Sequence, residues 1–379
     1  MLYLTCFLVS IFLIYREDVT ARRVYGVLTS GILIILAALR DEKVGYDVMI
    51  YQKAMFSIAK KSTSIISYYQ NRMISSMEPL YSLVTYVASR LGNISSLFLI
   101  NETIIVVFTL ITLRNMRDYA EPHISFACFV FQYYLRGYDT VRQSMAQAIV
   151  FYAYSLYEKK KHIPCIIFMV IAIGFHYSAV VGFGIILIKK LCDGQLKKVW
   201  TLIISMCTFI LCFAFRYIFI WVVNTFSFLP AKYISARYLF IEGGKIDFSV
   251  TKFLYVLFAF IILVIYGKRR EDQSTNNTSL YIANKCIENY DFLFIMMAFS
   301  LGGVIIASQA NFAHRVFYYP EMFSMVIIPN FVKIFKKDSL NRYLASIFLY
   351  IFLVAYCVEY FMVLNIGKTY PYILNKNIF

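Results

Sequence analysis

Residues 343–364 read YLASIFLYIFLVAYCVEYFMVL, and residues 94–113 read ISSLFLINETIIVVFTLITL. Both runs are close to the length of about 20 residues that a helix needs to cross a hydrocarbon layer. They are apolar all round, whereas a strand of a transmembrane β-barrel alternates apolar and polar residues over about 10 positions. The two runs therefore predict transmembrane helices and exclude a barrel.

The composition extends this prediction to the whole chain. Of 379 residues, 60% are hydrophobic and only 15% are charged, which leaves too little polar surface for a soluble globule of this size. Because backbone groups in lipid must be paired internally, we expect an all-α polytopic membrane protein, a single integral membrane domain over residues 1–379. The expected bundle has about 12 spans, with 11 to 14 allowed. They are residues 2–15, 24–39, 94–113, 123–135, 141–157, 163–175, 177–191, 199–223, 251–266, 289–308, 316–333 and 343–364.

The distribution of the net charge of +16 indicates which loops face the cytoplasm. Lysines and arginines gather in short clusters between apolar runs, as in Lys159 to Lys161, and such clusters mark cytoplasmic loops. No segment interleaves basic and aromatic residues as nucleic-acid readers do, so a nucleic-acid partner is excluded. Residues 79–91 are short and begin with Glu78-Pro79, a helix-start signal, so we expect a half-helix or re-entrant segment there. The expected outside segments are 40–78, 136–142, 224–250, 309–315 and 364–379.

Four polar groups follow the run 24–39. They form the pattern Arg40-x4-Gly45-x-Asp47-x3-Tyr51 in the outside segment 40–78, where we also expect helices that lie along the membrane surface. Asp47 is either a counter-ion for Arg40 or a general base, and Glu78 has the same two interpretations. Charged groups at a membrane surface are usually functional.

Further cations lie in the expected outside segments. Arg136 precedes Arg142-Gln143, which opens a helix. An isolated arginine at a helix end often anchors the span, but two of them on the outside face run against the charge rule. The planar guanidinium binds phosphate oxygens in pairs, so this segment predicts contacts with a phosphate or pyrophosphate.

Histidines mark two more outside turns. His176 separates two spans and could be a core histidine or a group that takes a proton from a sugar hydroxyl. His314-Arg315 repeats this chemistry with Tyr318 close behind. The eight cysteines lie in apolar runs or inside loops and form no metal-binding pattern, so neither a disulfide framework nor a metal site is expected.

Together these residues resemble the Wzy-type polysaccharide polymerases, specifically the EpsG-like branch. The resemblance rests on the pattern from Arg40 to Tyr51, on Glu78, on Arg142-Gln143-x2-Ala146, on His176-x-Ser178 and on Arg315-x2-Tyr318, in that order along the chain. The chain departs from the family at Tyr46, where a small polar residue is common. Its loop 224–250 is also short for the family.

The resemblance implies a glycosyltransferase-C-like bundle with an outward-facing cavity. It further implies an enzyme that needs no metal or other cofactor and joins oligosaccharide repeat units linked to undecaprenyl pyrophosphate. The reaction would take place at the outer side of the bacterial cytoplasmic membrane, in O-antigen, capsule or exopolysaccharide biosynthesis. The implied partners are the lipid-linked oligosaccharide, the bilayer, a chain-length regulator and a flippase.

The expected roles follow from this chemistry. His176 or Asp47 activates the acceptor hydroxyl, and the arginines Arg142, Arg136 and Arg315 hold pyrophosphate, with Arg40 assisting or pairing with Asp47. The remaining substrate-binding residues are Gly45, Tyr51, Glu78, Gln143, His314 and Tyr318.

Two other classes of protein remain open at this point. A polyprenyl-linked glycan flippase or transporter would also be a basic helical bundle, but it should show internal repeats or charges near the midplane. A membrane-bound acyltransferase acting on a polysaccharide would also use histidine, but on the cytoplasmic side. Labelling a cysteine placed at position 176 from each side of the membrane separates the acyltransferase from the polymerase.

Overall fold

The computed structural model describes residues 1–194, 198–215, 217–218, 221, 225, 249–275, 285–309 and 313–375. Over these ranges every regular element is a helix, and an isolated bridge pairs Arg40 with Leu374. The expected all-α class is therefore confirmed. The predicted outside loop 224–250 lies almost wholly outside the described residues.

Several helices have the length and composition of membrane spans. Four are long and apolar enough to cross a bilayer: Ile94–Asn115, Val250–Lys268, Tyr290–Ala307 and Leu340–Val363. Three shorter apolar helices, Val24–Ala38, His162–Phe175 and Val199–Phe213, coincide with other expected spans. The chain is a membrane protein, and the count of about 12 spans stays a prediction.

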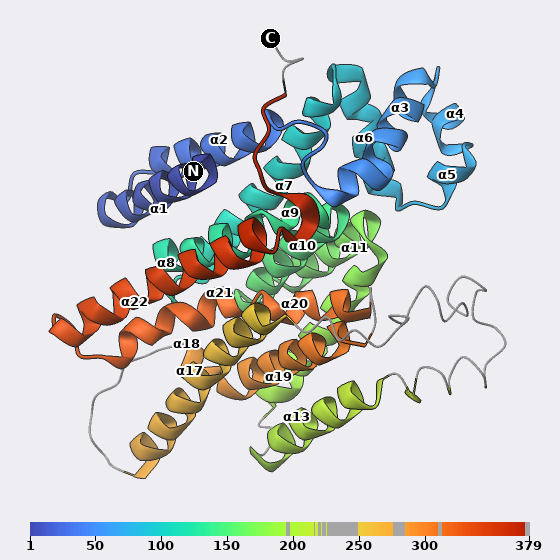
Figure 1. Cartoon of the computed structure of the whole chain (residues 1–379). Helices are drawn as coiled ribbons and strands as arrows, with labels where there is room; N and C mark the ends of the chain where they lie inside the picture. Colours follow the sequence, from blue (N-terminus) through green and yellow to red (C-terminus); the bar gives the residue numbers. More distant parts are fainter. Residues whose placement is uncertain are drawn as a thin grey trace. The chain divides into compact units, whose positions relative to one another are not determined.

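The described residues divide into two compact units. The first contains residues 1–183 and 331–379, and the second contains residues 184–330. Helices of the first unit begin with α1 (Leu2–Thr20) and α2 (Val24–Ala38), which pack along each other (Figure 1). The others are η1 (Val48–Gln52), α3 (Lys53–Lys61), α4 (Ile65–Tyr69), α5 (Arg72–Ser75), α6 (Pro79–Leu91), α7 (Ile94–Asn115), α8 (Pro122–Cys128), η2 (Phe129–Tyr134), α9 (Arg136–Asp139), α10 (Val141–Glu158), α11 (His162–Phe175), η3 (Tyr177–Val180), α22 (Leu340–Cys357), η6 (Val358–Val363) and η7 (Ile366–Lys368).

Local chemistry explains where the helices around segment 40–78 begin. Pro79 occupies the first turn of α6, where its missing N–H costs no hydrogen bond. Asn93 caps α7, because its side chain accepts a hydrogen bond from the Ser95 N–H. The predicted helix start at Glu78-Pro79 is confirmed, whereas the membrane depth of α6 and of the short helices α3, α4 and α5 stays a prediction.

The C-terminal segment runs beside the end of α2. The Asp41 N–H donates to Ile373 O at 2.7 Å, and the Asn375 N–H donates to Leu39 O at 2.9 Å. The Tyr372 hydroxyl also donates to Leu36 O at 3.0 Å. These bonds anchor residues 39–41, from which the polar pattern of segment 40–78 starts.

The second unit contains helices from the later part of the chain. They are α13 (Lys198–Phe213), α17 (Val250–Thr275), α18 (Lys285–Glu288), α19 (Tyr290–Ala307), η4 (Ala313–Phe317), α20 (Tyr318–Glu321), α21 (Ser324–Ile327) and the start of η5 (Ile328–Ile334), while α12 (Val181–Asp193) crosses the boundary between the units. The expected span 316–333 is therefore not one continuous helix. Pro320 and Pro329 lie within it, and each lacks the N–H that an uninterrupted α-helix requires.

Candidate active site

The polar pattern of segment 40–78 folds against the segment that leads into α10. The Arg40 guanidinium lies between two rings, with its Cζ atom 3.8 Å from the Tyr138 ring centroid and 4.1 Å from that of Phe98. Its Nη1 atom donates to Ala37 O at 3.1 Å. Such cation–π contacts are strongest when they are removed from water, and Arg40 is only 1% exposed.

Arg40 does not pair with Asp47, contrary to one of the sequence-based expectations. Its guanidinium is enclosed by aromatic rings, and the buried Glu102 of α7 interacts with it electrostatically. Enclosure also separates Arg40 from any substrate in solution. The residue therefore anchors the start of the pattern.

Gly45 allows the pattern to pass close to the chain before α10. Its φ of +102° lies in the left-handed region that side chains disfavour. A Cβ atom there would lie 2.5 Å from Tyr138 O. The Gly45 N–H donates to Lys368 O at 2.9 Å. Gly45 thus lets the pattern pass close to Tyr138, and its contact with substrate stays a prediction.

Asp47 caps the N-terminus of α10. Its Oδ2 atom accepts a hydrogen bond from the Val141 N–H at 2.9 Å and a second from the Tyr51 hydroxyl. Burial, together with the adjacent Asp47 carboxylate, raises the pKa of Tyr51 well above its ordinary value, while Arg142 opposes the shift. Tyr51 therefore stays protonated and donates to Asp47. A carboxylate at this position also interacts favourably with the positive end of the helix.

Arg142 is the cation at the centre of the cluster. Its Nη1 atom forms an ion pair with Glu78 Oε2 at 2.5 Å and approaches Met77 Sδ at 3.2 Å. Its Cζ atom lies 4.3 Å from the Tyr51 ring centroid. The Arg142 side chain keeps 20% of its surface exposed, against 6% for Glu78. A fixed guanidinium with an open side, in the first turn of a helix, suits an anion.

Arg136 and Gln143 are more enclosed than Arg142. Arg136 lies in α9 and is 3% exposed, with its Cζ atom 5.1 Å from the Tyr133 ring centroid. Gln143 follows Arg142 in α10 and is also buried. Contact of these two residues with pyrophosphate stays a prediction.

His176 ends helix α11 in the same unit. Its Nδ1 atom accepts a hydrogen bond from the Ser178 N–H at 3.2 Å and lies 2.7 Å from Ser178 Oγ. Because Nδ1 faces a backbone donor, we assign the proton of the neutral ring to Nε2. The end of α11 packs against the start of α6, since a Cβ atom at Gly174 would lie 2.6 Å from the Leu80 side chain. His176 is therefore at the end of α11 that meets the helix beginning beside Glu78.

His314, Arg315 and Tyr318 belong to the second unit, which we describe by itself. His314 Nε2 lies 3.0 Å from the Tyr318 hydroxyl. The Lys252 Nζ atom lies 3.8 Å from the Tyr318 ring centroid and 3.2 Å from Glu321 Oε2. Tyr318, Lys252 and Glu321 are buried, whereas His314 and Arg315 are only partly buried. A role in binding substrate stays a prediction for His314, Arg315 and Tyr318.

Lys252 and Glu321 were not among the site residues predicted from the sequence. Both side chains are buried, at 6% and 2% exposure. Each lies in an expected span, 251–266 or 316–333, where a charge is costly unless a partner is near. A search for opposite charges inside apolar runs would have found the pair. Among the described residues, no group of three or more His, Cys, Asp or Glu is arranged to hold a metal ion.

Comparison with known protein families gives one match. The family model for the EpsG family matches residues 23–374, nearly the whole chain. The chain belongs to the EpsG family. This match confirms the resemblance inferred from the motifs, and the family is associated with Wzy-type polymerases. No curated protein and no solved structure matches the chain.

Membership of the EpsG family indicates a polymerase-like role in the biosynthesis of exopolysaccharide or O-antigen. It is consistent with a glycosyltransferase-like enzyme. The match begins one residue before α2 and ends in the C-terminal segment that runs beside Leu39 and Asp41, so it includes the whole cluster around Arg142.

Proposed function

We propose that this EpsG-family protein is a polysaccharide polymerase. In this proposal it joins oligosaccharide repeat units linked to undecaprenyl pyrophosphate at the outer side of the cytoplasmic membrane, without a metal ion. The observation that carries the proposal is the position of Arg142, held by Glu78 and Tyr51 in the first turn of α10 with part of its side chain open. The required leaving group is a pyrophosphate, and such a site suits it.

The reaction moves one proton and exchanges one carbon–oxygen bond. The acceptor hydroxyl oxygen attacks the anomeric carbon of the growing chain, and the bond from that carbon to the lipid pyrophosphate breaks. The negative charge that develops on the departing pyrophosphate is stabilised by Arg142 and by the helix N-terminus.

We assign the acceptor proton to His176. The neutral ring carries its proton on Nε2, so Nδ1 is the basic atom, and it takes the acceptor proton once the imidazole turns away from the Ser178 N–H. Asp47 is a weaker candidate for this step, because its Oδ2 atom holds the Val141 N–H at the start of α10 as well as the Tyr51 hydroxyl. In the proposal Asp47 positions α10, and Arg136 and Gln143 support the same helix start.

The test is polymerisation of a purified lipid-linked repeat unit by the full chain in nanodiscs, with products resolved by size. We expect Arg142→Ala and His176→Ala to lose turnover by about 100-fold, the usual size of a lost acid–base or charge-stabilising group. The matched controls are Arg72→Ala and His162→Ala, because both side chains are exposed. Near-full turnover by either Arg142→Ala or His176→Ala at normal abundance would remove that residue from the mechanism.

A further inference from the structure

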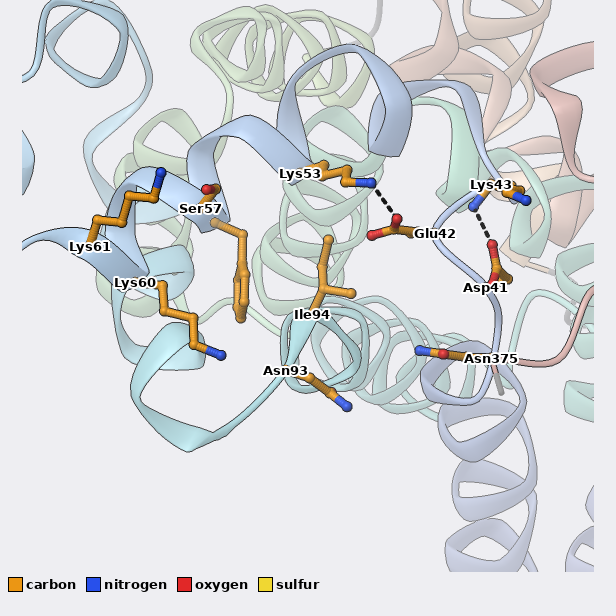
Figure 2. Close-up of a pocket in the computed structure, with 11 residues that line it drawn as sticks. Asp41, Glu42, Lys43, Lys53, Ser57, Lys60, Lys61, Asn93, Ile94 and Asn375 are labelled. Carbon is orange, nitrogen blue, oxygen red and sulfur yellow. Dashed lines mark hydrogen bonds and ion pairs between the residues drawn. The ribbon is translucent and has the colours of Figure 1, made fainter. Parts of the chain in front are cut away.

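A basic groove lies beside helix α3, apart from the contacts of Arg142. It has a volume of about 570 Å³, within the range of small-molecule sites. Figure 2 shows its lining side chains, which come from the loop after α2, from α3, from the α6–α7 turn and from the C-terminal segment. They are Asp41, Glu42, Lys43, Lys53, Phe56, Ser57, Lys60, Lys61, Asn93, Ile94 and Asn375.

The groove carries an excess of positive charge. Four lysines line it against two carboxylates, and the Lys53 ammonium is paired with Glu42 (Figure 2). In the part of the chain that the structure describes, Lys43, Lys60 and Lys61 have no carboxylate within ion-pair distance. An anion that enters the groove would meet cations whose charge is not yet neutralised.

The walls of the groove are fixed by contacts that use no lysine. Arg90 of α6 donates through Nη2 to Ala59 O at 2.8 Å and to Ser62 O at 2.5 Å, which fastens the end of α3. Asn93 Oδ1 caps α7 and leaves the Nδ2 donor of the same amide for a ligand. A preformed site loses less conformational entropy when it binds.

The lining chemistry favours a saccharide. Ser57 and Asn93 offer the hydrogen bonds that hydroxyl groups need, and only Phe56 and Ile94 among the lining residues are apolar. A lipid headgroup site would need more apolar surface for acyl chains. Lys53 and Lys60 are seven residues apart on one helix, or about 10 Å along its axis, so their charges suit an extended ligand better than a compact pyrophosphate.

We propose that this groove, between α3 and the α6–α7 turn, is a second saccharide subsite that binds acidic sugar residues of the glycan. The inference rests on the proposed function, because it assumes that the substrate is a glycan on this side of the membrane. Its ligand class is a carboxylate-bearing oligosaccharide. The site lies on the segment that also carries Asp47 and Tyr51, so it would hold the chain near the Arg142 cluster without taking part in the chemistry.

The test measures binding of tri-galacturonate to the full chain in phosphatidylcholine nanodiscs by calorimetry. We expect Lys60→Gln/Lys61→Gln to weaken binding about fivefold, as two lost exposed ion pairs would, and added salt to weaken it further. Lys336→Gln/Lys337→Gln makes the same charge change at exposed sites elsewhere and should leave the affinity unchanged. Glu42→Gln removes a carboxylate from the groove and should tighten binding.

Three results would overturn the subsite: no binding of tri-galacturonate, equal binding by the lysine variant, or equal binding of neutral maltotriose. Loss of tri-galacturonate binding when phosphatidylglycerol is added to the nanodiscs would assign the groove to anionic lipid instead. Binding needs no turnover, so it is measured apart from polymerisation. If the protein polymerises lipid-linked units but does not bind tri-galacturonate, only the subsite is refuted. If it binds tri-galacturonate but does not polymerise, the proposed function is refuted.

Discussion

Replacing Arg40 by lysine tests whether the first residue of the polar pattern is an anchor. Lysine keeps the charge and can still donate to Ala37 O, but its compact ammonium cannot stack on Phe98 and Tyr138 at once as the planar guanidinium does. Two desolvated cation–π contacts contribute about 1–2 kcal/mol each, so losing one of them costs about 1–2 kcal/mol. For a compact unit of this size that loss lowers the unfolding temperature by roughly 4 °C.

The assay is thermal unfolding of purified protein with a thiol-reactive dye. The exposed Cys207 sets the signal before unfolding, and the rise on heating reports exposure of the buried cysteines, of which Cys128, Cys165 and Cys357 lie in the same unit as Arg40. Arg72→Lys is the control, because Arg72 is an exposed residue of α5 and its replacement should leave the unfolding temperature unchanged. If Arg40→Lys unfolds at the wild-type temperature yet loses polymerisation, Arg40 acts in the chemistry and the anchoring role is refuted.

Three further predictions use the same preparations. Gly45→Ala should reduce the yield of folded protein, because the left-handed φ and the 2.5 Å approach to Tyr138 O leave no room for a methyl group. Gly31→Ala is the control, because Gly31 has open space around it, and its yield should not change. Equal yields for the two variants would refute the close approach of Gly45 to Tyr138. Glu78→Gln should lower turnover about 10-fold or more and should also lower the unfolding temperature by a few degrees, since it weakens the charged hydrogen bond that orients Arg142. Unchanged turnover would contradict this. Lys252→Met and Glu321→Gln should each destabilise the protein by about 3–5 kcal/mol, because each leaves a buried charge without its partner. The double variant should be destabilised by less than the sum of the two single variants, as judged by size-exclusion chromatography after heating. Additive losses would show that the two buried charges are not coupled.

Helix positions in the first unit followed well from the sequence, because they depend on local signals. The run 24–39 is helix Val24–Ala38, and the run 94–113 is helix Ile94–Asn115. Glu78-Pro79 marks the start of α6 to the residue. The prediction of one helix over residues 316–333 was wrong. It gave more weight to the apolar composition of the run than to its two prolines, which interrupt a helix.

Partners of the charged residues could not be derived in the same way. The sequence shows that Arg40 and Asp47 are close along the chain, so pairing them is the simplest expectation. In the structure, Arg40 binds rings from α7 and α9, and Asp47 binds the backbone of Val141. These contacts join residues about 60 to 100 positions apart, and no local pattern specifies such distant pairs.

The polar pattern therefore acts as one unit that positions Arg142. Its members contact residues 138–142, where α10 begins, in matching order: Arg40 and Gly45 meet Tyr138, Asp47 meets Val141, and Tyr51 meets Arg142. Because each contact has its own geometry, a shift of one residue in either segment would take Asp47 off the first turn of α10 and Tyr51 off the guanidinium. The spacing of the pattern is thus set by the helix start that it supports. This explains why a glycine and a buried arginine belong to it, since each holds the pattern against Tyr138.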